Sequence, residues 1–409
     1  MVINKNICYN ILIGGDFIMD SIKILRIRYE NIPLFHEGCF EFSFIAKDRV
    51  SNPTQVFQLR KNLYTQKLIA LAGINASGKT SALKLIYIAM SILLHRKSLN
   101  ESSYGAELLQ NGTVIILDFC YQGICYELRS TIGKTTLIRD TDVQLYFKEE
   151  ILFKKFLASM KSKKELLHFD DMQPMMRRTE LPLATLDFLK RDDSMVVGIV
   201  RNQSSILRSL IGATNINLWQ LRESPADEVL HVFDASLDEL TASEADGNVT
   251  YTVKFKNDSR RLSVPTVWGL GNLISSGTIK GQNIMAYIEA VLQTGGYLIV
   301  DEFENHLNKE LVRMIMDIFK NECINKNGAC LIFSTHYTEI LDFMDRKDNI
   351  YITRRNREDA SIELLNYASE VKRNDVKKSE VILSNYIEGT APSYESIQAL
   401  EDYLCSKMD

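Results

Sequence analysis

The chain has 409 residues, of which 45% are hydrophobic and 24% charged, as in a globular protein of one large domain or two to three ordinary ones. The formal net charge of -4 at pH 7 excludes a chain that coats nucleic acid through bulk positive charge, and it leaves a local basic face open. No stretch is long and apolar enough to span a membrane, so we expect a cytoplasmic protein without membrane contact.

The seven cysteines form an odd set without a CxxC pair. This usage is typical of reduced thiols in a cytosolic protein rather than of a disulfide framework or a zinc site. We therefore interpret the cysteines as small core residues.

The first half of the chain begins with residues 1–18, which we predict to be a disordered extension. From Ile22 to Ile45 the residues alternate as in an antiparallel pair of strands. The apolar run from Gln66 to Ala72 predicts a buried strand, and the spacing from Ser81 to Lys97 predicts a helix.

Further along, residues 113–140 predict two or three more strands of this antiparallel sheet, with Gln122 and Gly123 in a hairpin turn. Residues 141–225 carry Leu, Lys, Glu and Met at helical spacing and predict a compact helical insertion. A strand is expected from Gly247 to Phe255, and strands and helices alternate from Val267 onward.

The stretch "GINASGKT" satisfies the pattern G-x-x-x-x-G-K-[ST] completely and lies between the predicted strand and helix. In such a loop, backbone N–H groups surround phosphates, Lys79 reaches the β- and γ-phosphates, and Thr80 offers a hydroxyl to Mg²⁺. A similar "GKTT" begins at Gly133, but Leu128 stands where the first glycine should be, so we interpret it as structural. The predicted nucleotide-binding residues are Gly73, Ile74, Asn75, Ala76, Ser77, Gly78, Lys79, Thr80 and Ser81.

Two later strands end in polar residues. The stretch "GGYLIVDEFENHLNKEL" places Asp301 and Glu302 at the end of an apolar run, where Asp301 can hold Mg²⁺ beside Thr80 and Glu302 can polarise the attacking water. The stretch "ACLIFSTHYTEILD" places His336 at the tip of the next strand, a position that fits a sensor of the γ-phosphate.

The order of the P-loop, "LISSGTIKG", "YLIVDEFENHLN" and "STH" resembles the ABC-class ATPases, specifically their SMC-like and OLD-like branch. The resemblance covers roughly residues 20–140 and 245–355. It implies an α/β P-loop NTPase fold of the ABC-ATPase type, with a mixed sheet, antiparallel N-terminal strands and a helical insertion. It also implies ATP as the nucleotide and Mg²⁺ as the metal.

By the same resemblance, Ile274 to Thr278 ("ISSGT") corresponds to the signature motif, with Ser276 in place of its first glycine. Ser275 and Gly277 would then contact the γ-phosphate held by a second copy, in a homodimer or larger oligomer closed around ATP. The start of a helix is an anion site on physical grounds, although a simple serine cap explains the same residues. His306 to Asn308 corresponds to the D-loop, with Asn308 where an aspartate is usual.

The chain also departs from this branch. The glutamine loop cannot be assigned among Gln122, Gln144 and Gln203, and the insertion is too short for long coiled-coil arms. Too few residues follow Asn349 for a TOPRIM nuclease domain, so the likeness to stand-alone ATPases of abortive-infection and anti-phage systems implies a separately encoded, nuclease-like effector.

Three classes of function remain open. The first is an ATPase switch that controls an effector, with Glu302 and His336 as its catalytic residues. The second is a slowly hydrolysing scaffold or clamp on nucleic acid, and the third, disfavoured by the insertion and the signature, is a transporter subunit. The predicted divisions are residues 1–18 (extension), 19–140 (first part of the ATPase head), 141–225 (insertion), 226–355 (second part of the head) and 356–409 (helical tail).

Overall fold

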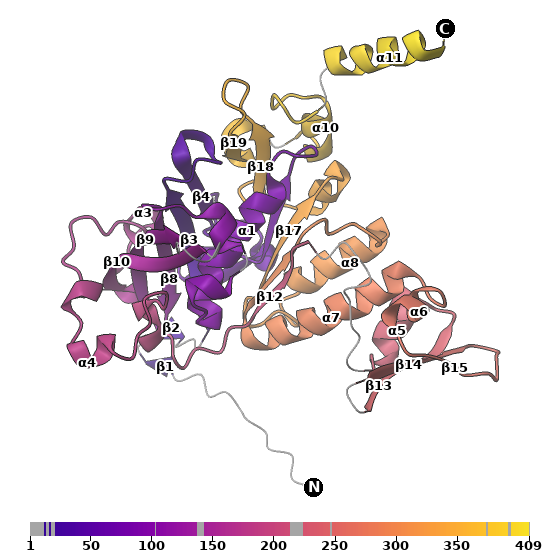
Figure 1. Cartoon of the computed structure of the whole chain (residues 1–409), viewed down its shortest axis with the longest axis horizontal. Helices are drawn as coiled ribbons and strands as arrows, with labels where there is room; N and C mark the ends of the chain where they lie inside the picture. Colours follow the sequence, from indigo (N-terminus) through magenta and orange to yellow (C-terminus); the bar gives the residue numbers. More distant parts are fainter. Residues whose placement is uncertain are drawn as a thin grey trace. The chain divides into compact units, whose positions relative to one another are not determined.

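The computed structural model describes residues 12–13, 16–17, 21–102, 104–136, 143–212, 224–245, 248–373, 375–391 and 394–408. The chain divides into two compact units (Figure 1). The first comprises Met1–Gln66, Leu85–Leu207 and Thr294–Gly296, and the second comprises Lys67–Lys84, Arg208–Gln293 and Tyr297–Asp409. The units divide the chain differently from the predicted boundaries, because the P-loop groups with the C-terminal half.

The first unit is built on a six-stranded sheet in the order β11-β10-β9-β8-β3-β4, in which every neighbouring pair is antiparallel. The predicted hairpin turn is confirmed, since Gln122 and Gly123 both have positive φ, at 50° and 74°. A separate hairpin joins β5 (Val56–Arg60) to β6 (Leu63–Gln66). The strands of the large sheet are β3 (Lys23–Glu30), β4 (Cys39–Ser43), β8 (Val114–Tyr121), β9 (Ile124–Thr136), β10 (Val143–Phe156) and β11 (Met176–Arg177).

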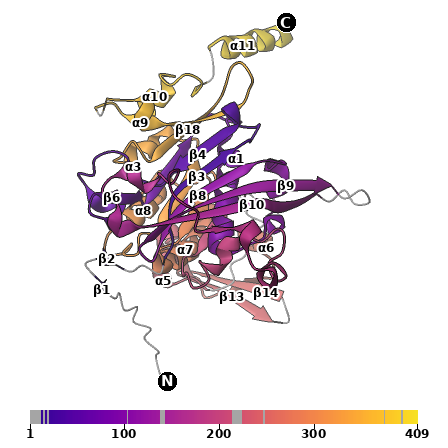
Figure 2. The ribbon, with the colours of Figure 1, turned by 90° about the vertical axis from the view of Figure 1, so that its left-hand side faces the viewer.

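The predicted helical insertion is wrong over β10. Residues 143–156 pair along β9, and the two long strands run side by side in Figure 2. Leu145, Phe147 and Leu152 of this strand are buried, so sheet formation overrides a spacing that also suits a helix. The helices that follow in this segment are single turns, α3 (Lys163–Leu166) and α4 (Leu183–Leu186).

The second unit is built on a six-stranded mixed sheet in the order β12-β16-β17-β7-β18-β19. Strands β16, β17, β7 and β18 are parallel, whereas β19 is antiparallel to β18. Strand β17 therefore lies between the P-loop strand β7 and the acidic strand β16. The strands are β7 (Leu68–Ala72), β12 (Leu207–Leu210), β16 (Tyr297–Val300), β17 (Cys330–Thr335), β18 (Ile350–Arg355) and β19 (Ile362–Asn366).

Helices of the second unit share one hydrophobic core with this sheet. Residues Ile279, Ile284, Ile288 and Val291 of α7 (Ser276–Thr294) and Val312 and Ile315 of α8 (Lys309–Lys320) pack with buried residues of β7, β16 and β17. The predicted helix after the P-loop is confirmed as α1 (Lys79–Met90), which a π-helical turn extends from Ser91 to His95.

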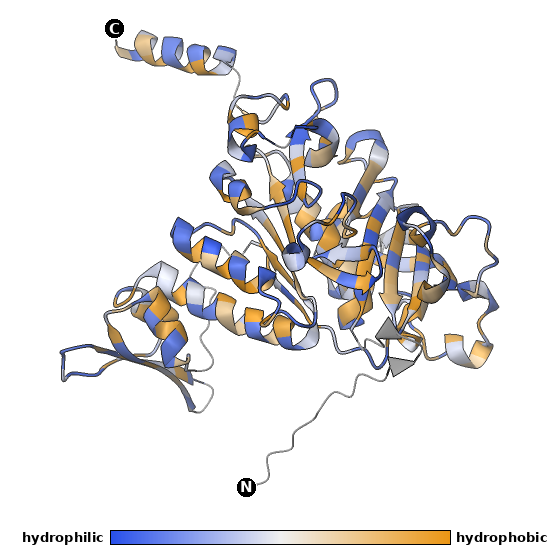
Figure 3. Ribbon diagram, turned by 180° about the vertical axis from the view of Figure 1, so that it is seen from behind, coloured by the Kyte–Doolittle hydropathy of each residue, from blue (hydrophilic) through white to orange (hydrophobic). Residues whose placement is uncertain are grey.

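Smaller elements complete the second unit. The predicted strand near residues 247–255 is confirmed as β14 (Asn248–Phe255), between β13 (Leu237–Ala245) and β15 (Leu262–Val264). The predicted helical tail also contains β19, and its last helix, α11, carries hydrophobic and hydrophilic residues side by side (Figure 3). The remaining helices are α5 (Asp227–Phe233), α6 (Val267–Gly271), α9 (Tyr367–Glu370), α10 (Lys378–Leu383) and α11 (Tyr394–Met408).

The prediction of a disordered extension at residues 1–18 lies mostly outside the described residues, and within it β1 (Leu12–Ile13) pairs with β2 (Asp16–Phe17). In the part of the chain that the structure describes, no helix has both the length and the apolar character needed to cross a bilayer.

The interpretation of all cysteines as reduced core residues is wrong. Cys120 and Cys125 lie opposite each other on β8 and β9, with a Cα–Cα distance of 4.2 Å, and form a disulfide. The hairpin register brings them together, which spacing in the sequence did not indicate. Cys39, Cys323 and Cys405 are exposed, and Cys330 is buried.

Candidate nucleotide-binding site

The predicted P-loop follows β7 and leads into α1, and two of its glycines are required by close contacts. A Cβ on Gly73 would lie 2.4 Å from the carbonyl oxygen of Thr353, and one on Gly78 would lie 2.4 Å from the side chain of Ile362. Gly78 also has a φ of 104°, which L side chains rarely adopt. Strands β18 and β19 therefore hold the loop, and Arg355 Nε donates to the carbonyl of Ala76 at 3.0 Å.

Lys79 lies buried inside this loop. Its Nζ donates to the carbonyls of Gly73 and Ile74 at 2.8 and 3.0 Å, and it lies 3.2 Å from Nδ1 of His336. Burial lowers the pKa of Lys79 to about 8, against the attraction of Asp301, Glu304 and Glu302. An ammonium can only donate, so Nδ1 of His336 accepts and Nε2 carries the proton.

The acidic strand β16 brings Asp301 next to the start of α1. Thr80 Oγ1 donates to Asp301 Oδ2 at 2.8 Å, and Ser334 Oγ of β17 donates to Asp301 Oδ1. Ser334 Oγ also accepts from the backbone N–H of Glu302 at 2.8 Å. One serine thus fixes both acidic residues, because β16 and β17 are parallel neighbours that end together.

Glu302 faces His336 across the end of β17. Glu302 Oε1 lies 3.8 Å from His336 Nε2, and Glu302 Oε2 accepts from the side chain of Asn305. The side chains of Glu302 and His336 keep 33% and 28% of their surface exposed, so both remain accessible to a water molecule. The backbone N–H of His336 donates to Glu304 Oε1 at 2.6 Å, which fixes the histidine at the tip of β17.

These residues fit a magnesium nucleotide. Oxygen ligands such as the Thr80 hydroxyl and the Asp301 carboxylate are those that Mg²⁺ takes, and they are in contact here. The start of α1, at Lys79, presents partial positive charge for phosphates. The described contacts thus bring together the P-loop, Asp301, Glu302 and His336, as the sequence predicted.

The other predicted residues, Ser275 and Gly277, lie at the start of α7. Ser275 Oγ accepts from the backbone N–H of Thr278 at 3.0 Å, which is the geometry of a helix cap. A Cβ on Gly277 would lie 2.3 Å from the carbonyl oxygen of His306, and Ser276 Oγ lies 3.0 Å from Nδ1 of the same histidine. Asn308, in the predicted D-loop, caps α8 by accepting from the N–H of Leu311.

Three residues of the site did not stand out in the sequence. Ser334 and Glu304 lie within the quoted strand ends, but only the parallel pairing of β16 and β17 shows what they contact. Lys280, within "LISSGTIKG", is buried with 4% of its surface exposed. A charged residue in a helix gives no sequence signal of burial, so only the fold identifies it.

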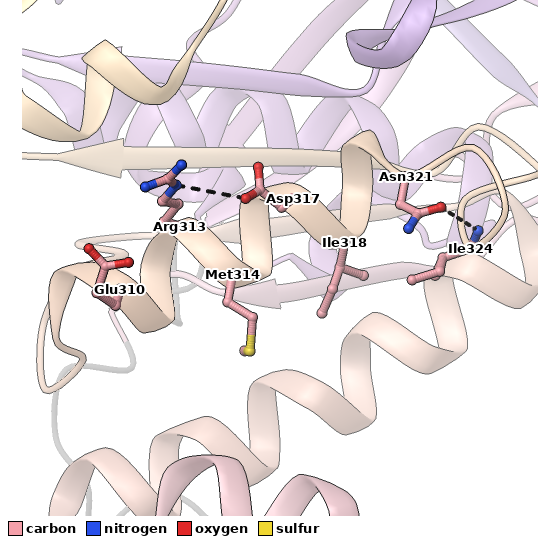
Figure 4. Close-up of a pocket in the computed structure, with 7 residues that line it drawn as sticks. All are labelled: Glu310, Arg313, Met314, Asp317, Ile318, Asn321 and Ile324. Atoms are coloured by element: carbon pink, nitrogen blue, oxygen red, sulfur yellow. Dashed lines mark hydrogen bonds and ion pairs between the residues drawn. The ribbon is translucent and has the colours of Figure 1, made fainter.

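A cavity of about 430 Å³ lies beside α8 and the segment after it, between Glu310 and Ile324 (Figure 4). Acidic, basic, amide and apolar side chains line it, and none of the predicted site residues is among them. This cavity is therefore separate from the P-loop site.

A glycine loop between β7 and α1, with Asp301 at the end of a second parallel strand, defines a P-loop NTPase of α/β fold with a mixed sheet. The chain belongs to the family described as "AAA domain, putative AbiEii toxin, Type IV TA system", which matches residues 68–342. That range contains the P-loop, the start of α7, the acidic strand and His336. No curated protein matches the chain. The match confirms the AAA-type part of the resemblance.

Proposed function

We propose that this chain binds and hydrolyses ATP and acts in the cytoplasm as a nucleotide-driven switch. The observation that carries the proposal is the meeting of Lys79, Thr80, Asp301, Glu302 and His336 at the ends of the parallel strands β7, β16 and β17. Ligands of open α/β sheets bind at the carboxyl ends of such strands.

Each residue then has a chemical task. The loop N–H groups and Lys79 bind the phosphates, while Thr80 and Asp301 hold Mg²⁺, whose charge stabilises the phosphoryl oxygens. Glu302 accepts the proton of the attacking water, and its contact with Asn305 orients the carboxylate. His336, with its proton on Nε2, donates toward the charge that develops on the γ-phosphate.

We further propose the ABC-type, SMC-like arrangement in which two copies close around two ATP molecules. Ser275 and Gly277 of one copy would complete the site of the other, since the start of the long helix α7 favours an anion. Closure and reopening would then control a separate, nuclease-like effector. The family description, which names a putative AbiEii toxin and a type IV TA system, supports a role of this kind in defence.

The first experiment measures phosphate release from ATP with Mg²⁺, with and without DNA. Lys79→Ala should remove nucleotide binding, whereas Glu302→Gln should keep binding and lower kcat by about 10²- to 10⁴-fold. If the wild-type chain binds ATP but completes no second turnover under either condition, the scaffold or clamp function replaces the switch.

A second measurement addresses the two-copy arrangement. The Glu302→Gln variant should shift to a larger mass in solution when Mg-ATP is added, because a blocked base holds the closed state. Lys79→Ala or Ser275→Arg, added to this variant, should abolish the shift. A mass that ignores ATP while nucleotide still binds would contradict the contact of Ser275 with a partner's nucleotide.

A further inference from the structure

Lys280 is a buried cation that ends on the turn containing the proposed catalytic base. Its Nζ donates to three backbone carbonyls, those of Glu302, Phe303 and Asn305, at 3.1, 3.2 and 2.7 Å. An ammonium has three N–H donors, so the turn uses all of them. The side chain of Lys280 thus works as a clamp on residues 302–305.

This turn needs such a clamp because its backbone is strained. Glu302 has a φ of 47°, in the left-handed region that a non-glycine residue occupies at a cost of order 1 kcal/mol or more. The N–H of Asn305 closes the turn by donating to the carbonyl of Glu302 at 3.0 Å. Lys280 binds that same carbonyl, and it therefore stabilises the conformation that points the Glu302 carboxylate toward His336.

Burying the charged side chain of Lys280 costs free energy, and an apolar residue with a purely structural role at this position would not have that cost. Its pKa is lowered to about 8 by burial, against the attraction of Glu304, Glu302 and Asp301. A buried charge persists when specific hydrogen bonds compensate it, and apolar residues often fill such a position with no loss of stability. The ammonium is therefore better explained by what it holds than by stability alone.

The same helix carries the residues proposed to act on a partner's nucleotide. Ser275 caps α7, and Ser276 and Gly277 contact His306, so the start of α7 touches one end of residues 302–306. Lys280, one turn further along α7, holds the other end through the carbonyl of Glu302. A shift at the start of α7 would move Lys280 and, with it, the carbonyl of Glu302. This continuous set of contacts joins the proposed signature to the proposed base within one copy of the chain.

We propose that Lys280 is a positioning residue that sets Glu302 for hydrolysis and links it to the start of α7. The inference rests on the proposed ATPase function. Lys280 would act through Glu302, without touching the nucleotide, so its removal should affect the chemical step and leave binding unchanged.

The experiment compares steady-state kcat and the affinity for a fluorescent ATP analogue in the full-length chain. Lys280→Met should lower kcat by about 10- to 100-fold, as expected when a catalytic group is misplaced by about an ångström, and should change nucleotide affinity less than twofold. Lys280→Arg, which keeps the charge and donors, should restore part of the activity. In the Glu302→Gln background, Lys280→Met should cause no further loss in single-turnover rate, because residues that act as a unit are not additive.

The chain offers a matched control in Lys347. Its Nζ also donates to three carbonyls, those of Val371, Lys372 and Arg373, outside the site. Lys347→Met should leave kcat unchanged, and the melting temperatures of both variants show how much of any loss of activity comes from stability.

Two results would overturn the inference. One is that Lys280→Met has the same kcat as the Lys347→Met control. The other is that Lys280→Met lowers the single-turnover rate by the same factor in the Glu302→Gln background as in the wild-type chain. By contrast, a wild-type chain without any turnover would overturn the proposed function itself, together with the inference that rests on it.

Discussion

Gly277 shows at the scale of one residue how closely α7 meets the turn after β16. A Cβ at this position would lie 2.3 Å from the carbonyl oxygen of His306, whereas one at Gly271 of α6 would meet nothing within 4 Å. Alanine usually favours a helix over glycine, but overpacking at Gly277 should outweigh this. We expect Gly277→Ala to lower the free energy of unfolding by about 1–3 kcal/mol in urea denaturation. Gly271→Ala is the control, and equal stability of the two variants would contradict the contact.

The lowered pKa of Lys280 also predicts that kcat depends on pH. Its pKa is lowered to about 8, so the ammonium is present below that pH and is lost as the pH rises through it. The neutral amine has one donor fewer and no charge, so kcat at saturating ATP should fall above about pH 8. In Lys280→Arg, whose side chain stays charged, this fall should move to higher pH.

Lys79 titrates in the same range but should be separable. Its pKa in the free chain is also about 8, yet phosphates bound to it favour the charged form. Because kcat reports the complex and kcat/KM the free chain, Lys79 should contribute mainly to kcat/KM. If wild type and Lys280→Arg share one kcat profile, another group causes the fall.

The sequence predicted those site residues that form local patterns. The P-loop is recognisable because its glycines, lysine and threonine are consecutive and flanked by a strand and a helix. Asp301 and His336 are recognisable because each ends an apolar run. Lys280 is not, because its task depends on carbonyls more than twenty residues away, which only the packing of α7 near β16 brings within reach.

At the scale of elements, β7, α1, β14 and the alternation of strands and helices after Val267 followed from apolar runs and their spacing, whereas β12 and β19 fell within segments predicted to be helical. The segment after β9 did not, because residues 143–156 carry Lys and Glu among apolar residues and suit either a helix or a two-faced strand. Pairing with β9 decided between them. Such a choice depends on pairing with another strand, so spacing alone leaves it open.

Helix α11 is an element whose removal should cost little. None of its side chains is buried, although Leu400, Tyr403 and Leu404 are apolar. We expect deletion of residues 392–409 to change the free energy of unfolding by less than about 0.5 kcal/mol. In α10, by comparison, Val381→Ala removes part of a buried core residue and should cost about 1–2 kcal/mol. A large fall in the free energy of unfolding on deletion would show instead that α11 packs against a second copy. A fall in the number of copies per particle, measured as mass in solution, would show the same.

At the scale of the whole molecule, the proposed switch requires two copies, because the proposed site is divided between the P-loop of one and the start of α7 of the other. A chain with Lys79→Ala keeps Ser275, and a chain with Ser275→Arg keeps the P-loop. Each variant alone therefore lacks one half of every site and should not hydrolyse ATP.

Mixing these two variants should restore activity. Since neither variant should close around ATP with itself, the closed dimers contain both chains, and each has one complete site of two, so phosphate release should reach up to about half of the wild-type rate. A mixture of Lys79→Ala with Lys79→Ala,Ser275→Arg contains no complete P-loop and serves as the control. If the first mixture stays inactive although mixed dimers form, Ser275 and Lys79 serve the same site within one chain. Recovery, in contrast, requires that Ser275 act on a nucleotide held by its partner, since no other pairing of these chains joins an intact P-loop to an intact start of α7.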